Sequence, residues 1–465
     1  MLFSSPIFFV FFSVYFLLHF VTPKQFRIYL IILGSTIFYG WWRIEYVWLP
    51  YLLSAIAYLG VIWMNGSVNP VARKRRAVAT VIGLFLPLVF YKYTDFFFRE
   101  LIGPLVGMHD NLLNLPLPLG LSFVTFTLTA YVIDIYKGKF PATSSASTVL
   151  AYVLFFPHLI AGPILRPDEL LPQLERKRIA TLRRFSVPLA IFSLGLVKKL
   201  VFADQVGFAV NDVYNQNGTL GALDALLAIY GFSVQIYCDF SGYTDMAIGL
   251  ALAIGIRLPN NFRRPYAARS LSDLWGRWHI TLSFWFRDYL FQPLGGYRHG
   301  RFTAIRNILI TMLLSGLWHG ANWTFLIWGL LHGIGISVNY LLRPVLRGLP
   351  SGKMPDWIGV LLTFHFFAFA AVFFRSPTIA KALDIWAAPF IGGWGGIASF
   401  AHNNIFPLLL ILVFFALHRF DDIRKVKFTA HYLRPELLWT ALAFCWLMAI
   451  TVSQGSTAAF IYFDF

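Results

Sequence analysis

Two histidines in strongly apolar surroundings are the side chains of this sequence best suited to chemistry. His279 lies in the run Asp273–Ser283, and His319 lies in the run Leu313–Trp323. An ionisable group is costly to keep among apolar residues, so its presence there indicates a function. Imidazole also exchanges protons near neutral pH, which suits general acid–base catalysis. Each histidine could instead be a packing residue bonded to the backbone, and the residues alone leave both interpretations open.

The two histidines have different local settings. His319 stands between Gly316 and Gly320 at the end of an apolar run, and the small residues are expected to open room beside its ring. His332 follows further along the chain and points to another face if one continuous helix carries both. His332 is therefore interpreted as a packing residue. His158 and His365 are interpreted in the same way, because they are lone residues with no partner pattern.

Two acidic residues interrupt another apolar run. Asp239 and Asp245 lie within Tyr237–Gly249. Buried carboxylates need partners, and four arginines downstream are the candidates: Arg263, Arg264, Arg277 and Arg287. The favoured interpretation is a set of structural ion pairs that locks an irregular segment against a helix. Substrate contact or orientation of a histidine is the alternative.

The sequence gives little support for a metal site or a serine nucleophile. No histidine or cysteine pair has the close spacing of a metal site, and a Gly-x-Ser-x-Gly nucleophile turn is missing, so neither a metal nor a serine nucleophile is predicted. Cys238 and Cys445 both lie in apolar segments, which favours packing over a disulfide framework.

The elements that must position these residues are membrane helices. The chain is 58% hydrophobic and 13% charged, with a mean hydropathy of +0.66, whereas soluble domains carry about 25% charged residues. Long apolar runs recur throughout: Ile28–Gly40, Val78–Tyr91, Ala225–Tyr237, Ile308–Leu317, Ile358–Phe374 and Phe406–Leu417. The length needed to cross a bilayer predicts an all-α, polytopic bundle of about ten to twelve spans. Strands of alternating hydrophobicity, as a barrel would need, are not seen.

The net charge of +17 is explained by the membrane without nucleic acid, because basic residues concentrate in cytoplasmic loops. The clusters are Arg73–Arg76, Arg176–Arg178 with Arg183 and Arg184, Arg257–Arg277, and Arg424–Lys427. Placing Arg73–Arg76 inside also puts Lys24 and Arg27 inside and the N-terminus outside. The segment Leu2–Val21 lacks a basic start and a cleavage site, so a retained helix is expected.

Two stretches do not read as clean spans. Residues 157–200 and 257–300 combine prolines with many charges. Irregular backbone at membrane depth is tolerated only where protein or a water-filled cavity satisfies its polar groups. Re-entrant segments and interfacial amphipathic helices are equally open interpretations.

Together these runs resemble the membrane-bound O-acyltransferase family, in particular its bacterial branch for polysaccharide O-acetylation. The matching segments are Pro118–Phe123, Phe156–Pro163, Asp239–Asp245, Asn261–Tyr266, Arg277–Ser283, Trp285–Leu290, Pro293–Gly296 and Trp318–Gly320, with Phe460–Phe465 resembling that branch's ending. Each run is weak singly, but the order is specific. One departure is Gly276, where this branch often has arginine.

The resemblance implies one membrane domain over residues 1–465, with a catalytic core over about 118–375 and short re-entrant helices around a central funnel. It makes His319 the catalytic base. His279 would position either the acceptor or the thioester carbonyl. Five further residues are assigned to this site by the same reasoning: Arg263, Arg264 and Arg269 toward an anionic donor, with Trp318 and Asn322 as substrate contacts.

The resemblance also implies substrates and partners. Acetyl-CoA in the cytoplasm is the expected donor, with no bound cofactor, and the protein is expected in the bacterial inner membrane. A periplasmic partner of the SGNH-hydrolase-like type would complete transfer to an exported polysaccharide, in contact with its biosynthetic machinery. Alginate is the expected polymer, with cellulose, peptidoglycan or teichoic acid as alternatives. A transporter or flippase without acyl chemistry is the alternative class, but paired inverted halves are not found.

Overall fold

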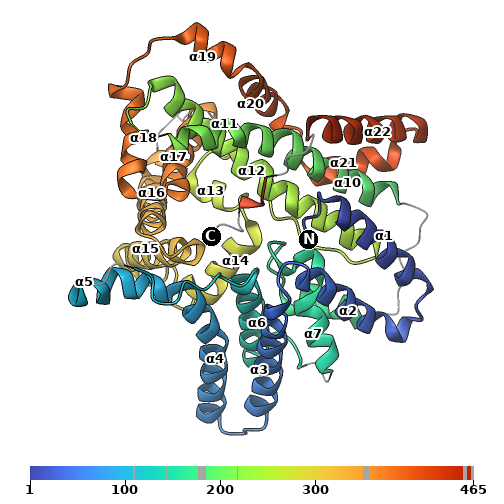
Figure 1. Ribbon diagram of the computed structural model, residues 1–465. Coiled ribbons are helices and arrows are strands. Elements are labelled where there is room, and N and C mark those ends of the chain that lie inside the picture. Colours follow the sequence, from blue (N-terminus) through green and yellow to red (C-terminus); the bar gives the residue numbers. More distant parts are fainter. Residues whose placement is uncertain are drawn as a thin grey trace. The chain divides into compact units, whose positions relative to one another are not determined.

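The computed structural model describes residues 1–107, 110–142, 145–175, 185–216, 218–348, 356–453 and 458–461. These residues form helices and their connections, with no β-strand among them, which confirms the predicted all-α class (Figure 1). The predicted basic cluster at 176–184 and the last four residues of the run Phe460–Phe465 lie outside the described residues.

The chain packs as two compact units. The first unit comprises Met1–Leu189 and Ala247–Pro259, and the second comprises Ala190–Met246 and Asn260–Phe465. The boundary therefore falls inside the long helix α12 (Ala222–Ala253). A single domain over the whole chain stays a prediction.

The first unit is built from helices of 4 to 28 residues. They are α1 (Pro6–Val21), α2 (Arg27–Gly40), α3 (Trp48–Asn65), α4 (Pro70–Phe97), α5 (Gly103–Val106), α6 (Leu121–Tyr136), α7 (Ala146–Leu154), α8 (Phe156–Leu159) and α9 (Pro167–Glu175). Helices α3 and α4 form a hairpin, and both pack against α6. A Cβ at Gly60 would clash with Thr80, so glycine allows α3 and α4 to approach closely.

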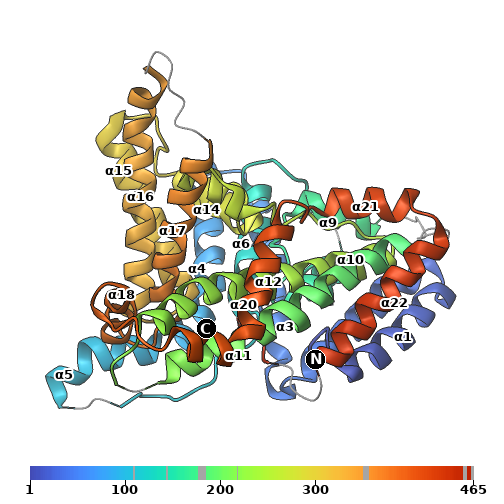
Figure 2. The same cartoon turned by 90° about the horizontal axis from the view of Figure 1, so that it is seen from above.

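The second unit holds the remaining helices, except for the first residues of α10 and the last residues of α12, which belong to the first unit. They are α10 (Ser186–Val197), the π-helix η5 (Lys198–Ala203), α11 (Asp204–Asn215), α12, η6 (Pro265–Ala267), α13 (Leu271–Trp275), α14 (Ile280–Phe286), η7 (Arg287–Phe291), α15 (Gly300–His319), α16 (Trp323–Gly348), α17 (Asp356–Arg375), α18 (Ile379–Ile391), α19 (Ile397–Asn403), α20 (Ile405–His418), α21 (Ile423–Tyr432) and α22 (Pro435–Val452). Helices α15 and α16 lie side by side in both views (Figure 1, Figure 2).

Seven helices among the described residues are long and apolar enough to cross a membrane, or eight if the bent pair α19 and α20 is one span. The polytopic prediction is confirmed, although this number is below the ten to twelve expected from the apolar runs. The difference arises because several runs lie in short helices: α1 and α6 have 16 residues each, and α2 has 14.

The two irregular stretches have different outcomes. Residues 257–300 do form short helical pieces, η6, α13, α14 and η7. For 157–200, the prediction of an irregular stretch was wrong in its last part, because Ser186–Asn215 is a continuous candidate span. The hydropathy of the sequence did not predict this span, because two charged residues, Lys198 and Lys199, lie inside it.

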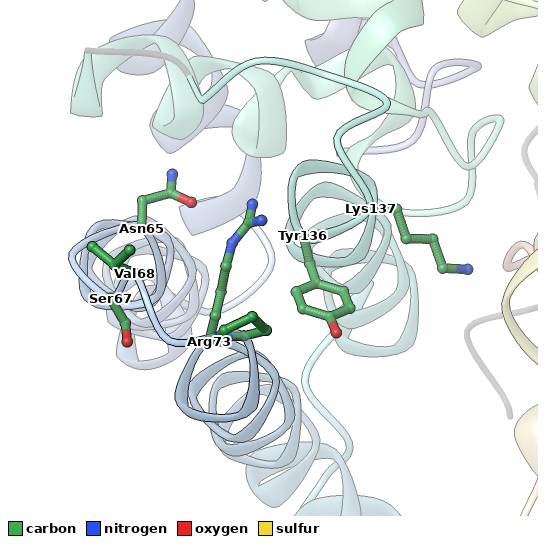
Figure 3. Close-up of a pocket in the computed structure, with 7 residues that line it drawn as sticks. Asn65, Ser67, Val68, Arg73, Tyr136 and Lys137 are labelled. Atoms are coloured by element: carbon green, nitrogen blue, oxygen red, sulfur yellow. The ribbon is translucent and has the colours of Figure 1, made fainter.

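Basic residues from two helix ends of the first unit meet at one cavity of about 630 Å³ (Figure 3). Arg73 near the start of α4 donates to the Ile135 carbonyl at 3.4 Å, and its guanidinium lies 5.7 Å from the centre of the Tyr136 ring. Lys137 follows α6 at the same cavity. The start of α4 and the end of α6 therefore share one side of this unit, as the predicted alternation of spans requires.

Sidedness is tested by cysteine labelling. With Cys238 and Cys445 replaced, a cysteine at Lys74 should react only with reagent on the cytoplasmic side, because basic loops are retained there. A cysteine at Ile44, which is 80% exposed and lies before α3, should react only from outside. Periplasmic labelling at Lys74 would reverse the topology.

Candidate active site

The α15–α16 hairpin positions His319. This residue ends α15, and its side chain is buried with 4% exposed. Three aromatic rings surround it: the ring centres of Trp318 and Phe374 lie 4.9 Å away, and that of Trp328 lies 5.2 Å away. Burial among these rings withdraws the imidazole from water.

The glycines near His319 serve helix packing. A Cβ at Gly316 would clash with the carbonyl oxygen of Phe325, and one at Gly320 would clash with the Phe325 ring. Helix α16 therefore fills the space that was expected to lie open beside the imidazole. The expectation was wrong because the glycines face the second helix of the hairpin, a contact that no local pattern reveals.

His279 sits at the junction before α14 with a left-handed backbone, φ 40° and ψ 54°. Its ring is fully buried, and Nδ1 lies 3.2 Å from Oδ1 of Asn261. The same oxygen accepts the backbone N–H of Thr281 at 3.2 Å and its hydroxyl at 3.0 Å. A residue held in this rarely populated conformation is costly unless its surroundings require it, and such residues gather at functional sites.

The hydrogen bonds of Asn261 define the chemical state of His279. An amide oxygen can only accept, so Nδ1 carries the proton and the lone pair lies on Nε2. Burial lowers the pKa of His279 to about 3, so the ring is neutral at physiological pH. His279 therefore presents a hydrogen-bond acceptor at Nε2.

Trp318 joins the two histidines, which are far apart in the sequence. Its ring centre lies 6.3 Å from that of His279 and 4.9 Å from that of His319. The indole is buried with 5% exposed. On another side, Phe240 contacts His279 edge to face at 4.6 Å. The predicted pair and Trp318 thus belong to one aromatic site.

The other predicted substrate residues have different surroundings. Arg263 is exposed, and Arg264 donates to the Arg419 carbonyl at 3.2 Å. Arg269 forms an exposed ion pair with Asp356 at 2.8 Å. Arg263 and Arg269 are exposed and Arg264 is half-buried, and contact of the three with a donor stays a prediction.

Asn322, the remaining substrate candidate, contacts backbone. Its amide nitrogen donates to the Pro377 carbonyl at 3.0 Å, and its oxygen accepts from the backbone of Thr324 at 3.1 Å. The oxygen therefore caps the start of α16, and the nitrogen ties this helix end to the connection between α17 and α18. A contact between Asn322 and the substrate stays a prediction.

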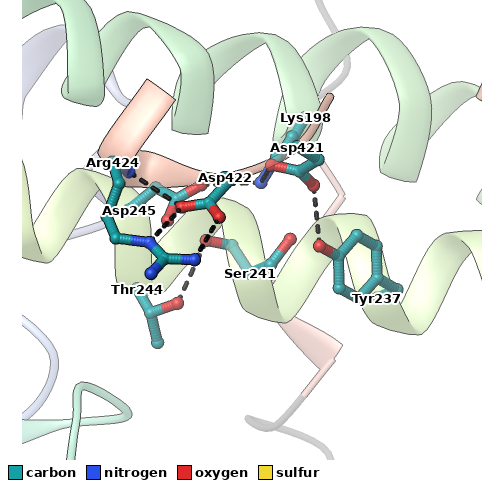
Figure 4. A network of polar contacts seen from close by, with 8 residues as sticks. All are labelled: Lys198, Tyr237, Ser241, Thr244, Asp245, Asp421, Asp422 and Arg424. Atoms are coloured by element: carbon teal, nitrogen blue, oxygen red, sulfur yellow. Dashed lines mark hydrogen bonds and ion pairs between the residues drawn. The ribbon is translucent and has the colours of Figure 1, made fainter. Parts of the chain in front are cut away.

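The buried aspartates do form ion pairs, but with lysines. Asp245 pairs with Lys198 at 2.7 Å, and Lys198 also contacts Asp421 at 2.6 Å (Figure 4). Tyr237 donates to Asp421 at 2.7 Å. Burial raises the pKa of Asp421, but the Lys198 ammonium outweighs this, and the pKa is lowered.

Lys199, the next residue of η5, makes a second set. It contacts Asp204 and Asp239, each at 2.8 Å. The arginines expected as partners pair elsewhere: Arg277 with Asp273 and Arg287 with Asp288, both at 2.7 Å. The predicted partners were therefore wrong. The two lysines were a signal in the sequence, because an ionisable pair inside an apolar span needs buried counter-charges.

The three histidines interpreted as packing residues contact an aromatic ring or a backbone carbonyl. His332 lies on α16 and His319 ends α15, so one continuous helix does not carry both. It is fully buried, and its ring centre lies 4.8 Å from that of Trp328. His158 bonds the Tyr152 carbonyl at 2.8 Å. His365 bonds the Leu361 carbonyl, also at 2.8 Å. Within the described ranges, no three histidine, cysteine or acidic side chains form a metal-binding group.

An all-helical membrane chain with a desolvated pair of histidines around one tryptophan suits acyl transfer, where a buried base activates an acceptor hydroxyl. The chain belongs to the membrane-bound O-acyltransferase family, whose model matches residues 139–375 and so includes both histidines. It is thus a membrane O-acyltransferase.

The chain is similar to proteins acting on different cell-surface polymers. It is 36% identical over 435 residues to the "probable alginate O-acetylase AlgI" of Pseudomonas aeruginosa, covering 90% of this chain and 82% of that protein. It is 38% identical over 422 residues to the peptidoglycan O-acetyltransferase of Helicobacter pylori, covering 83% and 79%. Identity to the teichoic acid D-alanyltransferase of Bacillus subtilis is 30% over 277 residues, covering 55% and 68%.

Proposed function

We propose that this O-acyltransferase passes acetyl groups from acetyl-CoA across the bacterial inner membrane for O-acetylation of an exported polysaccharide. The observation that carries the proposal is the placement of His279 and His319 around Trp318. Alginate is the proposed polymer, since the relatives named for alginate match over most of their length. Peptidoglycan is the second candidate, on the comparable match to the enzyme from Helicobacter pylori.

The chemistry follows from the two imidazoles. His319 takes the proton of the acceptor hydroxyl, whose oxygen attacks the thioester carbonyl, and the proton then leaves with the thiol. His279 offers a lone pair at Nε2, which can accept from a hydroxyl but cannot donate to a carbonyl. Of the two roles expected for His279, positioning the acceptor is therefore the one that its tautomer supports.

The donor and the polymer lie on opposite sides of the membrane in this proposal. The anionic donor meets the basic cytoplasmic segments, among them the exposed Arg263 and the half-buried Arg264. A periplasmic SGNH-hydrolase-like partner receives the acetyl group and completes transfer to the sugar. Membership of the family removes the alternative of a transporter without acyl chemistry.

His279 is the residue that tests the site. His279→Asn keeps a side chain that tolerates the left-handed backbone but removes Nε2. We expect polymer acetylation to fall on the order of 10²–10³-fold, the loss typical of one oriented hydrogen-bonding group, with the protein still in the membrane. Acetyl content of the polymer and CoA release are measured together.

A matched control is His365→Asn, because His365 is half-buried on α17 and bonds the Leu361 carbonyl of its own helix. Normal acetylation in His279→Asn would remove His279 from the reaction. Loss of the protein from the membrane in His279→Asn, with normal levels in the control, would show that His279 is structural.

A further inference from the structure

A segment distant in sequence from both histidines packs against an aromatic ring that contacts His279. In residues 458–461, Phe460 and Ile461 are buried, with 1% and 6% exposed. The Phe460 ring stacks on Tyr243 with centres 4.7 Å apart and lies 6.1 Å from Phe240. Phe240 in turn contacts His279. The segment is thus one aromatic ring away from a histidine of the candidate active site.

Buried charges hold the backbone of this segment. The Ile461 N–H donates to Oδ2 of Asp239 at 2.7 Å. The Lys199 ammonium donates to the Ala459 carbonyl at 3.3 Å, in addition to its contacts with Asp204 and Asp239. An ammonium has three N–H donors, and these three acceptors use all of them.

The buried charges and the packing of residues 458–461 depend on each other. The side chains of Lys199, Asp204 and Asp239 are each at most 4% exposed. Removing one partner of a buried hydrogen-bonded charge is costly, because the other charge then remains buried without compensation. Asp204 and Asp239 neutralise Lys199, and the backbone of residues 458–461 makes further hydrogen bonds with Lys199 and Asp239. These buried groups therefore favour the packed position of residues 458–461, which is called the seated position.

We propose that Lys199 and Asp239 are positioning residues that seat residues 458–461, so that Phe460 supports Phe240 against His279. The proposal rests on the proposed role of His279 in acyl transfer. The two lysines of η5 then have separate tasks, since Lys198 holds Asp245 and Asp421 while Lys199 holds the segment. Lys198 is accordingly a matched control of the same residue type, burial and ion pairing.

The packing of Phe460 against Phe240 and Tyr243 is tested directly by photo-crosslinking in the full-length protein. A benzophenone amino acid at Phe460 should crosslink to the peptide that contains Phe240 and Tyr243. The yield should fall at least tenfold in Lys199→Met and in Asp239→Asn, and stay within twofold of the parent in Lys198→Met. Equal yields in Lys199→Met and the parent would overturn the proposal, as would an equal loss in Lys198→Met.

Activity provides a second readout that does not rely on the lysine variants folding. Phe460→Ala should lower kcat on the order of 10²-fold through misplacement of a catalytic group, with KM for the donor unchanged within about twofold. Phe460→Tyr should restore most of kcat, because it keeps the stacked ring. Full kcat in Phe460→Ala would overturn the proposal. The crosslink needs no acetyl transfer, so failure of the proposed function alone would leave the crosslinking result intact.

Discussion

Replacing His319 by glutamine is expected to reduce polymer acetylation to background while the protein stays folded in the membrane. A positioned general base contributes typically 10²–10⁴-fold in rate, and the uncatalysed attack of a hydroxyl on a thioester is slow at neutral pH. Glutamine fills much of the space among Trp318, Trp328 and Phe374. Alanine would also remove the base but would leave a cavity in this aromatic cage, which costs stability.

The measurement is acetyl content of the polymer at matched membrane levels of the protein. His332→Gln is the structural control, because His332 is equally buried on α16 and also contacts Trp328. It should lower protein level more than it lowers activity per molecule. Normally acetylated polymer in His319→Gln would exclude His319 as the base.

The second large effect concerns the partner. Purified protein in liposomes, with acetyl-CoA on one face and polysaccharide on the other, is expected to acetylate the polymer slowly or not at all. In the proposed relay the step that reaches the sugar belongs to a separate periplasmic acetyltransferase, so the membrane protein alone lacks it. Adding the periplasmic acetyltransferase should restore transfer.

The control in this experiment is His319→Gln with the partner present, which should remain inactive because the partner alone has no access to the donor. Efficient acetylation by the parent protein without any partner would replace the relay by direct transfer. Acetylation by the partner with the inactive variant would show that the acetyl group reaches the polymer by another route.

The sequence by itself determined the class of the protein. The all-α membrane fold follows from hydropathy, because a bilayer demands helices whose backbone groups are satisfied internally. The two histidines were identifiable because an ionisable residue in an apolar run is rarely kept without a use. Short ordered motifs indicated the family, which the comparison confirmed. Each of these signals can be read along the chain without knowing which helices pack together.

Only the tertiary structure decided which residues meet. Asp239 and Asp245 called for cations, and arginines nearby in sequence were expected, but Lys199 and Lys198 on another helix supply the charge. Any cation satisfies a carboxylate, so composition could not choose between them. The burial of Phe460 beside Phe240 is equally nonlocal. Such contacts depend on how whole helices pack. A sequence motif gives the type of a residue and its neighbours in the chain, but it does not give the helices that the residue contacts in the folded protein.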